Sequence, residues 1–203
     1  AQSVKKGVKQ SGGTPREFCT ITVTDGIAMG HEGMKSSLIS REVIADSAEL
    51  TVRGHCYDAL VGIAGCDKSL PGLMMSMLRL NVPSVFIYGG SILPGKYKGK
   101  DVTVVDVFEA VGKHSSGKMS SEELRELELV ACPSAGACGG QFTANTMACV
   151  SEAIGLALPY SAGTPAPYEE RDKYAFESGQ AVMNLLEKKI KPREIVTKKS
   201  LEN

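Results

Sequence analysis

The sequence predicts an α/β fold: a three-layer α/β/α arrangement with a mainly parallel sheet, followed by a helical second half. β-rich runs alternate with helical patterns up to residue 90, as expected for βαβ units. The run over residues 57–65 is apolar almost throughout, as in a strand covered on both faces. Right-handed crossovers place the carboxyl ends of such strands at one edge of the sheet.

Five elements are expected in the first half. A β-branched run ending in Asp-Gly predicts the first strand. Apolar residues at helical spacing predict a helix that Gly54 ends, and Pro71 suits the first turn of the next helix. In order, the elements are a strand over 17–26, a helix over 40–55, a strand over 57–65, a helix over 71–81 and a strand over 83–90.

The second half is predicted to be mostly helical. Ser120 and Glu123 have the spacing of a capping box at a helix start, and Pro159 is expected to end a long apolar helix. A further helix is expected to begin at Pro192. The other predicted helices cover 103–114, 120–131, 141–158 and 168–190.

Composition limits the class of protein. The 203 residues, 42% of them hydrophobic, suffice for one sizeable domain. The 23 basic and 23 acidic residues balance, which argues against nucleic acid or an anionic membrane as partner. The sequence has no apolar run of membrane-spanning length, and the first twenty residues have no signal-peptide core. We therefore expect a cytoplasmic protein; the alternative is a mitochondrion or plastid after removal of a transit peptide.

The six cysteines form no CxxC pair, which argues against a zinc ribbon or a thioredoxin-like motif. At this chain length they do not resemble a secreted disulfide framework. For Cys19, Cys56 and Cys149 we expect small buried apolar side chains in a reducing compartment. Cys19 is placed in the first strand, and Cys149 on an apolar helix.

Three Gly-rich polar loops follow the predicted strands: "TDGIAMGHEG", "GCDKSLPG" and "YGGSILPG". Ligands of open α/β sheets bind outside the carboxyl ends of the strands, so the three loops are expected to meet at one site. The last loop offers Ser91 and backbone N–H groups to a substrate, or it is a simple turn. We assign catalysis to none of the three histidines, His31, His55 and His114.

Asp25 and Asp67 each end a predicted strand. Two carboxylates at one sheet edge suit a hard cation such as Mg²⁺. Alternatively, each is a helix N-cap or an ordinary loop residue. Lys68 adjoins Asp67, and its ammonium would repel a cation. It is therefore a surface lysine, a binder of anions or a modified residue.

Cys66 ends the predicted strand over 57–65, and Cys138 lies in a Gly-rich turn before a helix. A helix N-terminus stabilises an anionic thiolate, and glycines let a bulky ligand approach the backbone. Iron–sulfur clusters usually take four thiolates, so two cysteines cannot hold one alone. Spacing alone favours a structural role for both.

Four motifs in this order resemble the dihydroxy-acid dehydratases, in a group with 6-phosphogluconate and sugar-acid dehydratases. They are "VTDGIAMGHEGMKSSLISREVIADS", "GCDKSLPG", "YGGSILPGKYKG" and "ACPSAGACGGQFTANTM". The resemblance covers nearly the whole chain. It implies a hydro-lyase that converts 2,3-dihydroxyisovalerate and 2,3-dihydroxy-3-methylvalerate to 2-keto acids in valine and isoleucine biosynthesis. The alternatives are a sugar-acid or 6-phosphogluconate dehydratase and a non-catalytic remnant domain.

The resemblance also implies roles for the site residues. Cys66 and Cys138 match ligands of an iron–sulfur cluster, with 2Fe–2S favoured over 4Fe–4S. Asp25 and Asp67 match Mg²⁺ ligands, and Lys68 matches a lysine that is carbamylated and binds Mg²⁺ through its carbamate. Both metals would act as Lewis acids on one small dihydroxy acid.

Two departures from the family pattern follow from the same resemblance. Residues 1–203 correspond to an incomplete N-terminal α/β domain: the third cluster cysteine precedes them, and neither Cys19 nor Cys132 stands in its place. The family's C-terminal domain supplies a further Mg²⁺-binding glutamate and the serine base, so no catalytic base is expected within this chain. We expect these 203 residues alone to be inactive and the whole protein to be a homodimer.

Overall fold

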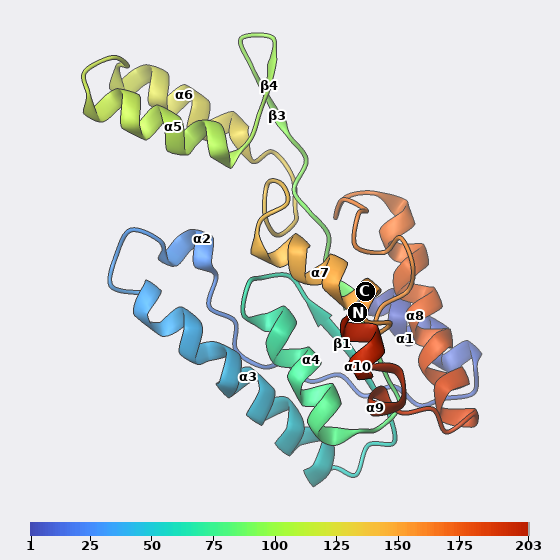
Figure 1. Ribbon diagram of the computed structural model, residues 1–203. Helices are drawn as coiled ribbons and strands as arrows, with labels where there is room; N and C mark the ends of the chain where they lie inside the picture. The colour runs from blue at the N-terminus through green and yellow to red at the C-terminus, as the bar shows by residue number, and fades with distance from the viewer. Residues whose placement is uncertain (203) are drawn as a thin grey trace.

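Residues 1–202 form a mixed α/β structure with a small parallel sheet in the computed structural model (Figure 1). The helices are α1 (Gln2–Gln10), α2 (Asp25–Ala28), α3 (Met34–Gly54), α4 (Ser69–Leu80), α5 (Val104–Ser115), α6 (Ser121–Ala131), α7 (Thr143–Ala153), α8 (Glu169–Glu187), α9 (Pro192–Ile195) and α10 (Lys198–Leu201). The strands are β1 (Leu60–Ala64), β2 (Ser84–Tyr88), β3 (Gly95–Tyr97) and β4 (Lys100–Val102).

The parallel sheet consists of β1 and β2, paired in register from Leu60 with Ser84 to Ala64 with Tyr88. The segment after α7 extends the pairing at one point, where the Phe86 N–H donates to the Leu156 carbonyl at 2.7 Å. Because both strands run in the same direction, their carboxyl ends lie at the same edge. The loops that follow β1 and β2 therefore start side by side.

Alternate residues of β2 enter two different hydrophobic clusters. Phe86 and Tyr88 pack in a cluster that includes residues of α3, α4 and α7, whereas Val85 and Ile87 pack with residues of α1 and α8. This is the two-residue period of a strand buried on both faces. The interface of α1 with α8 depends on glycine: a Cβ at Gly7 would lie 2.0 Å from the Phe176 carbonyl oxygen.

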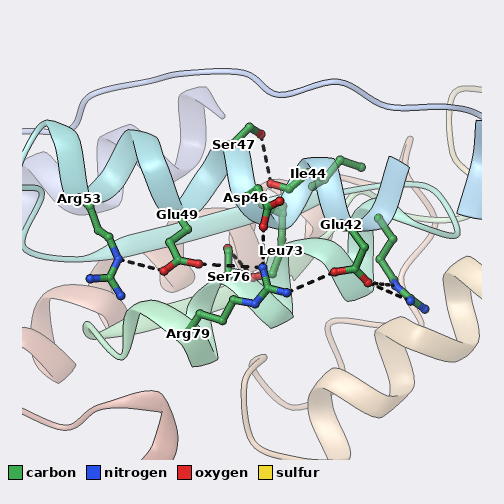
Figure 2. A network of polar contacts seen from close by, with 10 residues as sticks. Glu42, Ile44, Asp46, Ser47, Glu49, Arg53, Leu73, Ser76 and Arg79 are labelled. Carbon is green, nitrogen blue, oxygen red and sulfur yellow. Dashed lines mark hydrogen bonds and ion pairs between the residues drawn. The ribbon is translucent and has the colours of Figure 1, made fainter. Parts of the chain in front are cut away.

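Ion pairs at the surface join α3 to α4 (Figure 2). The Arg79 guanidinium of α4 lies 2.7 Å from Asp46 and 3.2 Å from Glu42, both on α3. Below these pairs, Ile44 and Ala48 of α3 pack in the same cluster as Leu70 and Met77 of α4. Because exposed pairs contribute little, we attribute the α3–α4 association mainly to this apolar contact.

Residues 95–131, here called the arm, project away from the sheet and its helices (Figure 1). The arm contains the antiparallel pair β3–β4 and the helices α5 and α6. It has a small core of its own, formed by Val102, Ala110, Leu127 and Ala131. Capping boxes at Thr103 and Ser120 start its two helices.

Most predicted elements are confirmed, with small differences in their ends. β1 and β2 lie within the predicted strands 57–65 and 83–90, and they pair in parallel as expected. α3 begins six residues before the predicted helix over 40–55 and ends at Gly54. The Ser120–Glu123 capping box is present, and Pro71 lies in the first turn of α4. α1 and the β3–β4 hairpin were not predicted.

The predicted strand over 17–26 is wrong. Residues 14–24 belong to no helix or strand, and Asp25 begins α2. The β-branched run has no partner strand in the described part of the chain, and strand propensity without a partner makes no sheet. The segment instead lies along α3, where Thr20 contacts the Ser47 hydroxyl. The parallel sheet thus has two strands in residues 1–202, and the three-layer arrangement stays a prediction.

Two further expectations need correction. The helix predicted over 141–158 ends at Ala153, well before Pro159, because Gly155 turns the chain with φ of +82° so that Leu156 reaches β2. The three cysteines expected to be buried, Cys19, Cys56 and Cys149, are exposed. Cys149 lies on the solvent side of α7, so an apolar helical pattern did not identify the buried face.

Candidate metal and cluster site

Two carboxylates and a lysine meet at the carboxyl edge of the parallel sheet. The Lys68 Nζ lies 2.7 Å from Asp25 Oδ2 and 3.8 Å from Asp67 Oδ2. Asp25 begins α2, while Asp67 and Lys68 form the turn between β1 and α4. All three side chains are largely buried, so the loops after residue 24 and after β1 converge as the sequence predicts.

Neither aspartate caps a helix. Asp25 lies inside the first turn of α2 and accepts hydrogen bonds from Lys68 and from the buried Ser37 hydroxyl of α3. Asp67 precedes Lys68, the N-cap position of α4, and that helix has no side-chain cap. The structure therefore contradicts the alternative that Asp25 and Asp67 are helix N-caps.

The two carboxyl groups have opposite pKa shifts. Burial by itself would raise the pKa of Asp25, but hydrogen bonds from Lys68 and Ser37 outweigh it, and that pKa lies below its usual value. Burial raises the pKa of Asp67, and the neighbouring Asp25 charge raises it further. Asp25 therefore ionises more readily than Asp67, and a further cation beside the pair would favour ionisation of both.

The turn that holds Cys66 is fixed by Ser69. The Ser69 hydroxyl accepts from the Cys66 N–H at 3.1 Å and donates to the Cys66 carbonyl at 2.8 Å. Cys66 itself is buried. The preceding Gly65 faces Ala137, because a Cβ on Gly65 would lie 3.3 Å from the Ala137 Cβ. The turn after β1 therefore lies against the Gly-rich turn that carries Cys138.

Backbone hydrogen bonds join the Cys138 turn to the loop after β2. The Ala137 N–H donates to the Gly90 carbonyl, and the Ile92 N–H donates to the Cys138 carbonyl, each at 2.9 Å. Gly136 leaves no room for a side chain, since a Cβ there would lie 2.5 Å from the Ser91 carbonyl carbon. The three turns with Asp67, Ser91 and Cys138 thus form one surface at the sheet edge.

Burial raises the pKa of the Cys138 thiol, and the neighbouring Asp67 and Cys66 act in the same direction. The backbone N–H groups of Ala144 and Asn145, in the first turn of α7, oppose this shift. The helix N-terminus acts as predicted, but burial outweighs it. Without a cation or an iron ligand, Cys138 is therefore a protonated thiol at neutral pH.

Two residues near the site carried no functional signal in the sequence. Tyr88 ends β2, and its hydroxyl donates to the Ala137 carbonyl. Arg171 of α8 donates to the Tyr88 carbonyl at 2.9 Å and to the Thr164 carbonyl. In the sequence, Tyr88 belongs to an apolar strand pattern and Arg171 to a charged segment of a predicted helix, so no local pattern distinguishes them.

Other candidates lie outside this arrangement. Cys132 and Cys19 are exposed, whereas Cys66 is buried and Cys138 is half-buried. The His31 ring contacts the Ile27 carbonyl and the Gly33 N–H within its own loop. The role of Ser91 as a substrate ligand or as part of a simple turn stays a prediction; its carbonyl accepts from the Ala166 N–H at 2.9 Å.

The donor set fits a divalent cation that takes a third ligand from Lys68. Within residues 1–202, no three His, Cys, Asp or Glu side chains are grouped to hold a metal ion. Asp25 and Asp67 flank the Lys68 ammonium, which occupies the position of a cation between two carboxylates. Converting that amine to an anionic oxygen ligand would leave three anionic groups around one centre, which suits Mg²⁺.

Comparison with known proteins gives one family. A family model described as dihydroxy-acid/6-phosphogluconate dehydratase N-terminal matches residues 1–203. The chain is 91% identical over 203 residues to a dihydroxy-acid dehydratase of Pelagibacter ubique, covering all of this chain and 36% of that protein. It is 81% identical to one of Parvibaculum lavamentivorans, covering all of this chain and 35% of that protein.

A more distant relative gives the same result. Over 200 residues the chain is 56% identical to a dihydroxy-acid dehydratase of Sulfurisphaera tokodaii, covering 98% of this chain and 36% of that protein. The chain thus spans about a third of the length of the curated relatives it matches.

Proposed function

Because the chain belongs to the dihydroxy-acid/6-phosphogluconate dehydratase N-terminal family, we propose that its parent protein removes water from 2,3-dihydroxy acids to give 2-keto acids. The convergence of Asp25, Lys68 and Asp67 beside Cys66 and Cys138 is the observation that carries this proposal. Relatives named dihydroxy-acid dehydratase support this substrate class over 6-phosphogluconate. The proposed substrates are 2,3-dihydroxyisovalerate and 2,3-dihydroxy-3-methylvalerate, of valine and isoleucine biosynthesis.

In this proposal Asp25, Asp67 and a carbamylated Lys68 hold Mg²⁺. Carbamylation would begin with loss of one proton from the Lys68 ammonium; addition of CO₂ to the neutral amine then releases a second proton, so the charge of the side chain changes from positive to negative. The two carboxylates that now neutralise the ammonium would then share the cation with the carbamate. Ser37, by donating to Asp25, fixes which oxygen of that carboxylate remains free for the metal.

Cys66 and Cys138 are proposed to ligate an iron–sulfur cluster, 2Fe–2S rather than 4Fe–4S, and the support for the cluster type is the resemblance of the motifs. Two thiolates do not complete a cluster. We propose that residues 1–203 belong to a larger N-terminal domain of three-layer α/β/α architecture that supplies a further cysteine. A C-terminal domain is proposed to supply the catalytic base.

When bound, Mg²⁺ and the cluster supply Lewis acidity to the substrate carboxylate and C2 oxygen and to the C3 hydroxyl, respectively. Because Cys66, Asp67 and Lys68 are consecutive, a cluster on Cys66 and a cation on Asp67 and Lys68 would lie within reach of one small molecule. The turns of Ser91 and Cys138 close one side of the site. We assign the proton transfer of the dehydration to none of the residues of this chain.

The remaining proposals concern the protein's setting. We propose a homodimer, supported by the resemblance alone. A cytoplasmic location is supported by the bacterial-type relatives and by the six free thiols, which suit a reducing compartment. Within residues 1–202, no helix is both long and apolar enough to cross a membrane.

The test uses the complete natural chain that carries these residues, reconstituted without oxygen with iron, sulfide and Mg²⁺. Formation of 2-keto acid from 2,3-dihydroxyisovalerate is followed, with 6-phosphogluconate in parallel. Turnover of the first substrate alone supports the proposal, and turnover of the second alone overturns the substrate assignment. With a cluster visible by absorbance, no turnover of either substrate would point to another sugar acid or to a non-catalytic protein. Iron and sulfide per chain distinguish 2Fe–2S from 4Fe–4S.

A further inference from the structure

We propose that Tyr88 and Arg171 are positioning residues that hold the Cys138 turn in the conformation the cluster site requires. This inference rests on the proposed function, because the cluster that Cys138 would ligate is part of that function. The contacts on which it depends are those of the chain itself: a buried phenol hydroxyl that reaches the Cys138 turn, and a buried guanidinium that binds the Tyr88 carbonyl and lies over the ring.

Tyr88 connects the end of the sheet to the Cys138 turn. It is the last residue of β2, 1% exposed, and its hydroxyl donates to the carbonyl of Ala137, the residue before Cys138. Burial raises the pKa of Tyr88, so the hydroxyl stays protonated and remains a donor across the ordinary pH range. A phenylalanine would fill the same space in the core but could not make this bond.

Cys138 has a backbone conformation that needs such support. Its φ of +71° lies in the left-handed region, which is unfavourable for a residue with a Cβ. Such a conformation persists only where the surroundings fix it, and it is concentrated at functional sites. Hydrogen bonds that fix this turn run from Tyr88 to Ala137, from Ala137 to Gly90, and from Ile92 to Cys138. Of these three, the first is made by the side chain of a residue outside the turn.

Arg171 acts on the other side of Tyr88. Its guanidinium carbon lies 5.8 Å from the centre of the Tyr88 ring, and it donates to the Tyr88 and Thr164 carbonyls. The side chain is 8% exposed, and its Nε has no hydrogen-bond partner within residues 1–202. A buried cation held by carbonyls is costly as a stabilising device. We attribute its presence to the position that it imposes on Tyr88 and on the loop at Thr164.

The test uses Tyr88→Phe in the complete natural chain without metals. Alkylation of each cysteine by iodoacetamide is followed by mass spectrometry. Loss of one hydrogen bond is expected to raise the alkylation rate of Cys138 about threefold to tenfold. Cys149, which is exposed on α7, is expected to keep its rate. An unchanged rate at Cys138 would overturn the proposal.

Tyr97→Phe is the matched control. The Tyr97 hydroxyl donates to Glu126 at 3.2 Å on the arm, so the same atom is removed away from the site. Its alkylation pattern is expected to equal that of the unmodified protein. A rise at Cys138 in Tyr97→Phe as large as in Tyr88→Phe would mean general loosening and would contradict a positioning role.

Arg171→Lys provides a second, independent variant. It keeps the charge but cannot hold two carbonyls as a planar fork. Faster amide hydrogen exchange is expected at Ala137 and Ala166, whose N–H groups bind the loop after β2. Unchanged exchange at both amides contradicts the role of Arg171. The alkylation and exchange measurements need no cluster. A protein that binds no cluster would therefore refute the proposed function, whereas the alkylation and exchange rates alone decide this inference.

Discussion

Lys68 Nζ lies 2.7 Å from Asp25 Oδ2, although the two residues are 43 positions apart in the chain. This ion pair joins the start of α2 to the turn after β1 and is largely shielded from water. It gives the unmodified chain a neutral arrangement at a site that we propose holds Mg²⁺. Asp67 is the third member, at 3.8 Å from the same nitrogen.

Asp25→Asn is expected to destabilise the metal-free protein by about 1–3 kcal/mol, because it leaves the Lys68 ammonium buried without its closest counter-charge. It is also expected to abolish Mg²⁺ binding. Urea denaturation and calorimetric Mg²⁺ titration measure the two effects. The control is Asp101→Asn on the arm, where an exposed carboxylate pairs with Lys96. A variant as stable as the control would contradict the energetic role of the Asp25–Lys68 pair.

At neutral pH, Asp67→Asn is expected to stabilise the metal-free protein, whereas Asp25→Asn destabilises it. The folded state raises the pKa of Asp67, so the folded state holds this proton more tightly than the unfolded state does. Its contribution to stability is therefore fully present below the ordinary value of 3.8 and is lost as the pH rises through the higher folded value. Asparagine does not ionise, so the variant does not lose stability in this way as the pH rises.

The measurement for Asp67→Asn is urea denaturation of both proteins with EDTA, from about pH 3 to pH 7. The stability of the variant relative to the parent should increase as the pH rises above 3.8 and then level off. A relative stability that is constant over this range, or that decreases, would count against the raised pKa. Mg²⁺ binding should be lost in the variant, since the carboxylate ligand is gone.

Two glycines inside helices predict opposite effects of the same substitution. Gly7→Ala in α1 places a Cβ 2.0 Å from the Phe176 carbonyl oxygen of α8, so α1 must move away, and we expect a loss of about 3 kcal/mol or more. Gly112→Ala in α5 meets no atom within 4 Å, so we expect a gain of about 0.5–1 kcal/mol from helix propensity. Thermal unfolding of both variants tests the pair. If the two substitutions changed the unfolding temperature equally, the α1–α8 contact at Gly7 would not be tight.

The sequence by itself determined the local elements and the chemical inventory. Continuous apolar runs identified β1 and β2, helical spacing identified α3 to α6 and α8, with a capping box at the start of α6, and the resemblance selected Asp25, Asp67, Lys68, Cys66 and Cys138. These features are readable because propensity, capping and side-chain period act within a few residues. The site roles of the five residues stay predictions until the loaded protein is measured.

Tertiary structure alone decided what depends on distant partners. The run over 17–26 has the residues of a strand, but a strand needs a neighbour, and none pairs with it within residues 1–202. Burial of the cysteines likewise depends on what packs against them, so Cys149 is exposed and Cys66 is buried. Tyr88 and Arg171 gained their place at the site from contacts across 49 and 83 positions, which no local pattern encodes.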